Sequence, residues 1–249
     1  IPASDVAVAI VNRVVPRLVG PRRLAKLALR DGVPASMRTL VAVPTLLSSE
    51  ADAVEQVSKL EVHFLANGRG DLRFAVLSDF PDSSNQATPT DLAVHGAAAE
   101  GIAQLNRRHG PAPDGGPRFF VLHRRRVWNE AQGAWMGWER KRGKLHELNR
   151  ILRGATDTTF VALPGGQLEV PSGVRFVITL DADTRMPQGA VVRLVGALAH
   201  PLNRPVYDPT VGRVVEGHAV LQPRVTALLP EGGKGSRYHR CARDRAGST

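Results

Sequence analysis

The stretch 174-VRFVITLDADTRMP-187 joins a short, mostly apolar run to a pair of carboxylates. The length and the β-branched composition of residues 174–180 predict a strand that is buried on both faces of a sheet. Because side chains alternate along an extended chain, Asp181 and Asp183 are expected to share one side, just beyond the carboxyl end of that strand. In open α/β sheets, ligands bind at that place.

Two carboxylates at a strand end indicate a site for a hard divalent cation. Mg²⁺ usually binds through one or two carboxylates together with the phosphate oxygens of a substrate. The sequence therefore indicates that Asp181 and Asp183 hold a divalent cation, Mg²⁺ or Mn²⁺, beside a phosphate-bearing substrate, for which a sugar nucleotide would supply the phosphate oxygens. The competing interpretation is a simple turn, since Asp and Thr are ordinary turn residues.

Composition and charge bound the class of protein. The 249 residues suffice for one large α/β domain or two small ones. The net charge of +10 makes nucleic acid, an anionic membrane surface and phosphate-bearing substrates candidate partners. Residues 118–153 hold ten basic and three acidic side chains without an RNA-recognition signature, which favours a local anion site and no nucleic-acid partner. Cys241 is the only cysteine, which excludes an internal disulfide and fits a reducing compartment.

Alternating helical and strand patterns follow one another along the chain. Residues 2–29 predict a basic amphipathic helix pair that either lies on a membrane or packs on a globular domain. Strands are expected at 38–45, 72–79, 118–123, 174–180 and 219–225, and helices at 49–67, 91–109, 141–153 and 187–199, with a loop at 202–211. This order predicts an α/β fold with a mostly parallel sheet flanked by helices.

Charged residues also occur at the end of one predicted strand and at the start of one predicted helix. Asp79 is the last residue of the strand at 72–79, and Lys141, Arg142, Gly143 and Lys144 open the helix at 141–153. Basic side chains and free backbone N–H groups at a helix start bind anions such as a diphosphate. All three tryptophans lie between Trp128 and Trp138, where they either pack at a core edge or stack on a ligand.

These signals, in this order, resemble the nucleotide-sugar glycosyltransferases of the GT-A (Rossmann-like) fold. The resemblance narrows at five segments: TLVAVPTLL (39–47), RFAVLSD (73–79), WMGWERKRGKLHELNRILRG (135–154), FVITLDADTRMP (176–187) and GRVVEGHAVLQPRV (212–225). They look like the glycosyltransferase domain of bacterial cyclic β-1,2-glucan synthases, and the likeness covers residues 1–229.

The resemblance implies an inverting, metal-dependent enzyme that uses UDP-glucose and a growing β-glucan acceptor. The part of the protein given by this chain would lie at the cytoplasmic face of the bacterial inner membrane, as part of a larger membrane protein. Residues 1–35 would be a helical, membrane-proximal lead-in, 36–229 the nucleotide-sugar-binding domain, and 230–249 a disordered or aberrant tail. By the same resemblance the donor-binding residues are Pro44, Thr45, Asp79, Lys141, Arg142, Gly143, Lys144, Asn149, Asp181 and Asp183.

The chain departs from the family pattern near its end. The acidic motif expected to supply the general base and the Q-x-x-R-W element are both missing, so no catalytic base is assigned, the fold is expected to be C-terminally incomplete, and the chain is expected to bind donor without transferring glucose. Two alternatives remain open. One is another processive β-glycan synthase domain, and the other is a non-catalytic basic domain that binds anionic lipid or nucleic acid.

Overall fold

The computed structural model describes residues 3–19, 24–162 and 167–223. The chain divides into two units, Ile1–Asn203 and Arg204–Thr249. The tail predicted to be disordered or aberrant, 230–249, lies outside the described residues.

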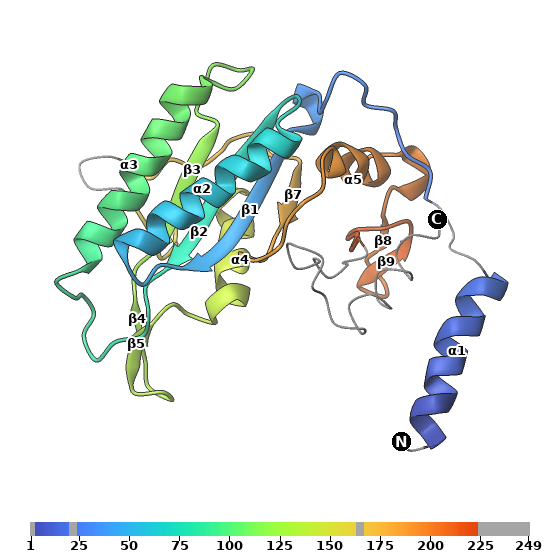
Figure 1. Ribbon diagram of the computed structural model, residues 1–249, viewed down its shortest axis with the longest axis horizontal. Coiled ribbons are helices and arrows are strands. Elements are labelled where there is room, and N and C mark those ends of the chain that lie inside the picture. Colours follow the sequence, from blue (N-terminus) through green and yellow to red (C-terminus); the bar gives the residue numbers. More distant parts are fainter. Residues whose placement is uncertain (1–2, 20–23, 163–166, 224–249) are drawn as a thin grey trace, which may run out of the picture. The chain divides into compact units, whose positions relative to one another are not determined.

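The first unit is built on a five-stranded sheet in the order β6-β3-β2-β1-β7 (Figure 1). Neighbouring strands run parallel, except that β6 pairs antiparallel with β3. The strand bounds are β1 Thr39–Leu46, β2 Leu72–Asp79, β3 Phe119–Arg124, β6 Phe160–Val161 and β7 Phe176–Thr179. This architecture confirms the expected fold class, a mostly parallel α/β sheet flanked by helices that is consistent with a GT-A-like, Rossmann-like fold.

Helices cover both faces of this sheet (Figure 1). Helices α2 (Glu50–Asn67), α3 (Asp91–His109) and α5 (Ala190–Leu198) pack on one core, which includes Val41 and Phe74. Helix α4 (Arg140–Ile151) packs on the other core through Leu148, against residues of the opposite parity such as Leu40 and Ala75. Alternate side chains of β1 and β2 therefore enter different cores, which is why these strands read as unbroken apolar runs.

Helix α2 shows how local sequence sets an element. Ser49 precedes the helix and its hydroxyl accepts a 3.1 Å hydrogen bond from the backbone N–H of Asp52, as the spacing predicted. The helix ends at Asn67, next to Gly68. Gly101 of α3 faces Val57 of α2 at a distance that leaves little room for a side chain, so the two helices approach closely.

The prediction that the strand at 174–180 is buried on both faces of the sheet is wrong. Strand β7 pairs with β1 alone among the described strands, its residues alternate between partly buried and exposed, and Val177 is 44% exposed. An apolar run indicates a strand but not how many neighbours the strand has, because those neighbours come from distant sequence. The buried centre of the sheet is instead formed by β1, β2 and β3.

Predictions near both ends of the described chain also need correction. One helix, α1 (Ala3–Val19), forms within 2–29, whereas residues 24–29 have no helical structure. They are held instead by α5 and the short 3₁₀ turn η2 (Pro201–Asn203), through Leu27 N–H to the Gly196 carbonyl (3.0 Å) and the Asn203 amide to the Ala25 carbonyl (2.7 Å). Those hydrogen bonds satisfy backbone groups that a helix would otherwise have paired internally.

The second unit contains a short hairpin whose first strand lies within the loop predicted at 202–211. Strand β8 (Val206–Asp208) pairs antiparallel with β9 (Arg213–Glu216). The strand expected at 219–225 is not formed over residues 219–223, and residues 224 and 225 lie outside the described part. The first unit also carries a 3₁₀ turn, η1 (Ala35–Met37), and a small hairpin of β4 (Val127–Asn129) and β5 (Ala134–Met136). Within the described residues, no helix is both long and apolar enough to span a membrane.

Candidate functional site

A cleft of about 410 Å³ opens at the carboxyl ends of β1 and β2. Its volume lies in the range typical of small-molecule sites. The end of β1, the segment after β2, the start of α4 and the turn after β7 all contribute to it. The lining residues are Pro44, Thr45, Leu46, Asp79, Phe80, Asp82, Gly137, Arg140, Lys141, Lys144 and Ala182.

Asp79 forms the floor of the cleft. It is the last residue of β2 and only 4% exposed. The guanidinium of Arg124 donates to both carboxylate oxygens of Asp79, from Nε at 2.7 Å and from a terminal nitrogen at 3.1 Å. Asp79 and Arg124 are also register partners on β2 and β3, so parallel pairing of the strands brings them side by side. The result is a bidentate, charge-assisted pair beneath the cleft.

Lys144 is also buried, at 3% exposure. Its ammonium group has three protein acceptors: the Thr45 carbonyl at 2.5 Å, the Leu77 carbonyl at 3.3 Å and the Asp79 carboxylate at 3.0 Å. Burial lowers the pKa of Lys144, and the nearby charge of Asp79 opposes that shift. All three N–H donors of the ammonium are thus directed at the protein, which makes Lys144 a link between α4, β1 and β2.

Two glycines, Gly137 and Gly143, allow the segment at the start of α4 to pack closely beside the cleft. A Cβ on Gly137 would lie 2.6 Å from the carboxyl carbon of Asp79, and a Cβ on Gly143 would overlap the carbonyl oxygen of Trp138. Between them, Glu139 and Arg140 adopt left-handed backbone conformations with φ of 50° and 45°. Such conformations cost of order 1–3 kcal/mol each, and they concentrate where a structure fixes a functional segment.

Exposed cations and carboxylates face one another around the mouth of the cleft. Lys141 donates to Asp181, and Arg140 donates to Asp82 at 2.6 Å. The side chains of Lys141 and Arg140 are 53% and 59% exposed, so both cations remain accessible to a ligand. Ion pairs this exposed are worth only about 0–1 kcal/mol and exchange partners readily.

Asp181 and Asp183 lie in a turn, where an extended chain was predicted. The Thr184 N–H donates to the Asp181 carbonyl at 2.9 Å, which closes the turn at the end of β7. Both aspartates are exposed. Their oxygens are hard ligands that suit Mg²⁺ or Mn²⁺, but the described residues contain no cluster of three or more metal-binding side chains. A cation bound here would therefore need further oxygen ligands from a substrate or water.

Five of the ten residues expected to bind donor line this cleft, whereas Gly143, Asp181 and Asp183 are among those that lie outside its lining. Pro44, Thr45, Asp79, Lys141 and Lys144 line it. Arg142 instead points to Glu139, with a 3.1 Å hydrogen bond, and Asn149 is exposed on α4; neither is a lining residue.

Sequence reasoning missed Arg124, Arg140, Asp82 and Glu147. The sequence did hold a signal for Arg124: it directly follows the strand predicted at 118–123, Asp79 ends the strand predicted before it, and a buried arginine needs a carboxylate partner. Glu147 gave no such signal, since an acid in the middle of a basic helix usually faces solvent.

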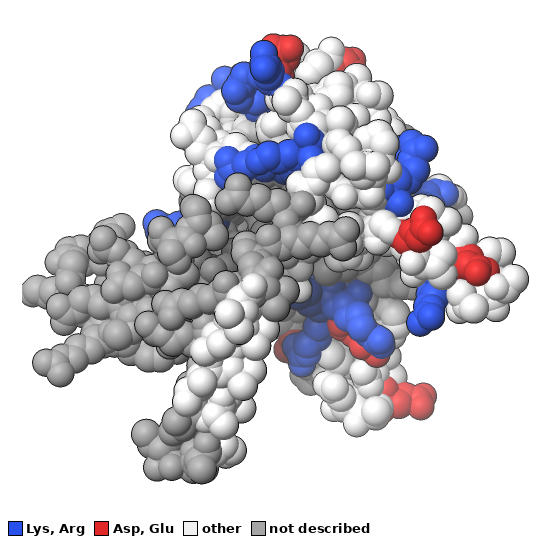
Figure 2. Space-filling model, turned by 90° about the vertical axis from the view of Figure 1, so that its right-hand side faces the viewer, with Lys and Arg blue, Asp and Glu red and all other residues white. Residues whose placement is uncertain are grey.

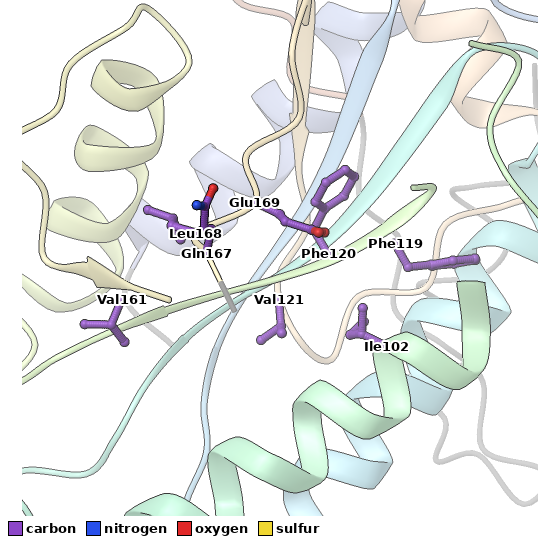
Figure 3. A pocket seen from close by; sticks show the side chains of 8 residues that line it. All are labelled: Ile102, Phe119, Phe120, Val121, Val161, Gln167, Leu168 and Glu169. Atoms are coloured by element: carbon purple, nitrogen blue, oxygen red, sulfur yellow. The ribbon is translucent and has the colours of Figure 1, made fainter. Parts of the chain in front are cut away.

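Two further hollows are smaller than this cleft. Figure 3 shows one beside β3, of about 20 Å³ and bordered by apolar side chains such as Phe119 and Val121, which has room for no more than a water molecule. The other, of about 280 Å³, lies between α2 and α3. On the face displayed in Figure 2, lysines and arginines form several separate groups.

Comparison with known proteins identifies a relative. The chain is 50% identical over 240 residues to the cyclic beta-(1,2)-glucan synthase NdvB of Rhizobium meliloti (strain 1021). No protein-family model matches the chain. The aligned part covers 96% of this chain but 8% of the relative, so the chain spans a small part of that protein. The resemblance inferred from the motifs is therefore confirmed: over nearly its whole length, this chain is similar to one partial domain of a cyclic β-(1,2)-glucan synthase.

Proposed function

We propose that the chain forms the donor-binding part of a glucosyltransferase that builds cyclic β-1,2-glucan from UDP-glucose. The observation that carries the proposal is the cleft itself, where two accessible cations of α4 pair with carboxylates: Lys141 with Asp181 after β7, and Arg140 with Asp82 after β2. The relative supports the product, since its name describes a cyclic beta-(1,2)-glucan synthase.

The charge arrangement suits a nucleoside diphosphate. Lys141 and Arg140 lie at the cleft mouth and are held only by exposed ion pairs, so a diphosphate can replace their carboxylate partners at little cost. Asp79 lies deeper, where we propose that it contacts the nucleoside. Lys144 lies beneath the cleft and contributes positive charge, but the protein already accepts all three of its N–H donors.

We further propose that Asp181 and Asp183 hold Mg²⁺ or Mn²⁺ together with the oxygens of the diphosphate. When bound, such a cation supplies Lewis acidity that stabilises negative charge on the leaving diphosphate. Lys141, which donates to Asp181, would then turn to the diphosphate and share that role.

The proposed reaction inverts the anomeric configuration. A hydroxyl of the growing β-glucan loses its proton to a base, and its oxygen attacks the anomeric carbon of UDP-α-glucose from the face opposite UDP. A new β-linkage forms while the bond to UDP breaks, and UDP leaves with the electron pair. We propose that the parent protein carries this domain at the cytoplasmic face of the bacterial inner membrane.

Titration calorimetry of the whole chain with UDP-glucose, with and without Mn²⁺ or Mg²⁺, tests the proposal. We expect saturable binding that needs the cation, and no transfer of radiolabelled glucose, because the motif expected to supply the base is missing from the sequence. Absence of binding under every condition would contradict the proposal. Binding to anionic vesicles or nucleic acid that falls steeply with salt and ignores the cation would favour the non-catalytic alternative suggested by the net charge of +10.

A further inference from the structure

We infer that Arg124 is the positioning residue of the cleft, which fixes both the carboxylate of Asp79 and the first turn of α4. Arg124 is fully buried and does not line the cleft, so it acts through other residues. The link to a nucleotide rests on the proposed function, whereas the positioning role itself rests only on the contacts below.

The guanidinium of Arg124, which belongs to β3, contacts two other elements, β2 and α4. Besides its two hydrogen bonds to Asp79, it donates to the Glu147 carboxylate at 3.0 Å and to the Arg140 carbonyl at 3.1 Å. Arg140 is one of the two residues held in a left-handed conformation at the start of α4. One buried planar cation thus ties the floor of the cleft to the segment that carries Arg140 and Lys141, which a lysine could not do with the same geometry.

Glu147 is the second carboxylate that pairs with Arg124, and it is itself held by several hydrogen bonds. Its carboxylate accepts hydrogen bonds from the Thr159 N–H (2.6 Å) and from the hydroxyls of Thr158 (2.9 Å) and Thr159 (2.8 Å). Burial raises the pKa of Glu147, but the hydrogen bonds from Thr159, Thr158 and Arg124 outweigh it and lower the pKa below its usual value. Glu147 is therefore held as a carboxylate, and Arg124 is clamped from two sides.

The cluster is also balanced in charge. Asp79 and Glu147 carry two negative charges, and Arg124 and Lys144 carry two positive charges, all buried beneath the cleft. Loss of the Arg124 charge would leave an uncompensated carboxylate directly under a site proposed to take a diphosphate. That negative charge would repel an anionic ligand. Loss of the Arg124 hydrogen bonds would in addition loosen the segment that carries Arg140 and Lys141.

The matched variants are Arg124→Lys, Arg124→Met and Arg73→Lys. Arg73 is a suitable control because it is also buried on the central sheet and paired with two carboxylates, Asp71 and Asp114, but lies at the opposite end of β2. Each variant is compared with the parent chain by thermal unfolding, by hydrogen exchange of backbone amides without ligand, and by calorimetry with UDP.

We expect Arg124→Lys to speed amide exchange over residues 137–147, whereas Arg73→Lys should affect residues near its own end of the sheet. With UDP, Arg124→Lys should lose about tenfold in affinity, the scale of one charge-assisted hydrogen bond, and Arg124→Met should lose more, while Arg73→Lys should stay within about twofold of the parent. Unchanged exchange over 137–147 in Arg124→Lys would overturn the inference, and so would parental UDP affinity in that variant. If the parent chain binds no nucleotide, the proposed function fails, and the exchange result alone decides the role of Arg124.

Discussion

Asp79 and Arg124 stand opposite each other at the ends of two adjacent parallel strands, and the guanidinium holds both oxygens of the carboxylate. This pair lies where open α/β sheets bind ligands. It converts two strand ends into a rigid floor, because each partner is buried and satisfied only by the other and by its immediate neighbours. Removing either partner therefore affects stability and the cleft together.

Asp79→Ala should weaken UDP and UDP-glucose by the same factor, since the proposed contact is with their shared nucleoside. The substitution also leaves the buried Lys144 without its carboxylate and Arg124 with Glu147 alone, and breaking such buried pairs typically costs about 3–5 kcal/mol of unfolding free energy. Urea unfolding measures that loss, and calorimetry on the folded fraction gives the two affinities. A loss confined to UDP-glucose would place Asp79 near the sugar and contradict the assignment.

The two lysines at the start of α4 should respond differently to loss of charge. Lys141→Met removes an exposed ion pair and should change the unfolding free energy by less than about 1 kcal/mol, yet weaken UDP binding. Lys144→Met removes a buried cation with three protein acceptors and should lower the unfolding midpoint clearly. Equal unfolding midpoints for the two variants would disprove this division of roles.

Sequence patterns predicted the fold well where the determinants are local. Apolar runs marked β1, β2 and β3, and the cap at Ser49 set the start of α2, because such signals depend on a few neighbouring residues. The edge position of β7 could not be read in this way, since it depends on which distant strand pairs with it.

The same limit applies to the site. Acids and cations at element ends indicated Asp79, Lys141 and Lys144, which the fold brings into one cleft. The contacts that organise them join residues far apart in sequence: Arg124 lies 45 positions from Asp79 and 23 from Glu147. Only the sheet register and the packing of α4 reveal that Lys144 has no free donor while Lys141 does face solvent.

Asp183→Asn should abolish the cation-dependent binding of UDP-glucose, because it removes a proposed ligand of the cation. The unfolding free energy should stay within about 0.5 kcal/mol of the parent, because Asp183 is exposed. Calorimetry with and without Mn²⁺ measures the first effect. Asp157→Asn is the control, since it removes an exposed carboxylate that pairs with Arg150 instead. Retained cation dependence in Asp183→Asn, or its loss in the Asp157 variant, would show that the cation binds elsewhere.

Stability should fall with acid in a way that depends on His123. Burial, with smaller contributions from His95 and Lys144, lowers the pKa of His123 from 6.5 to about 3, and its Nδ1 lies 2.8 Å from the Ser78 hydroxyl. Between pH 6.5 and about pH 3, the imidazole of His123 is therefore protonated in the unfolded chain but neutral in the folded chain. The contribution of neutral His123 to the unfolding free energy is complete above pH 6.5, and it is lost as the pH falls from 6.5 to about 3. Urea unfolding at several pH values gives the unfolding free energy as a function of pH, and its slope against pH should be shallower in His123→Gln than in the parent, by up to about one proton. A parental slope in His123→Gln would mean that the buried imidazole does not contribute to acid sensitivity.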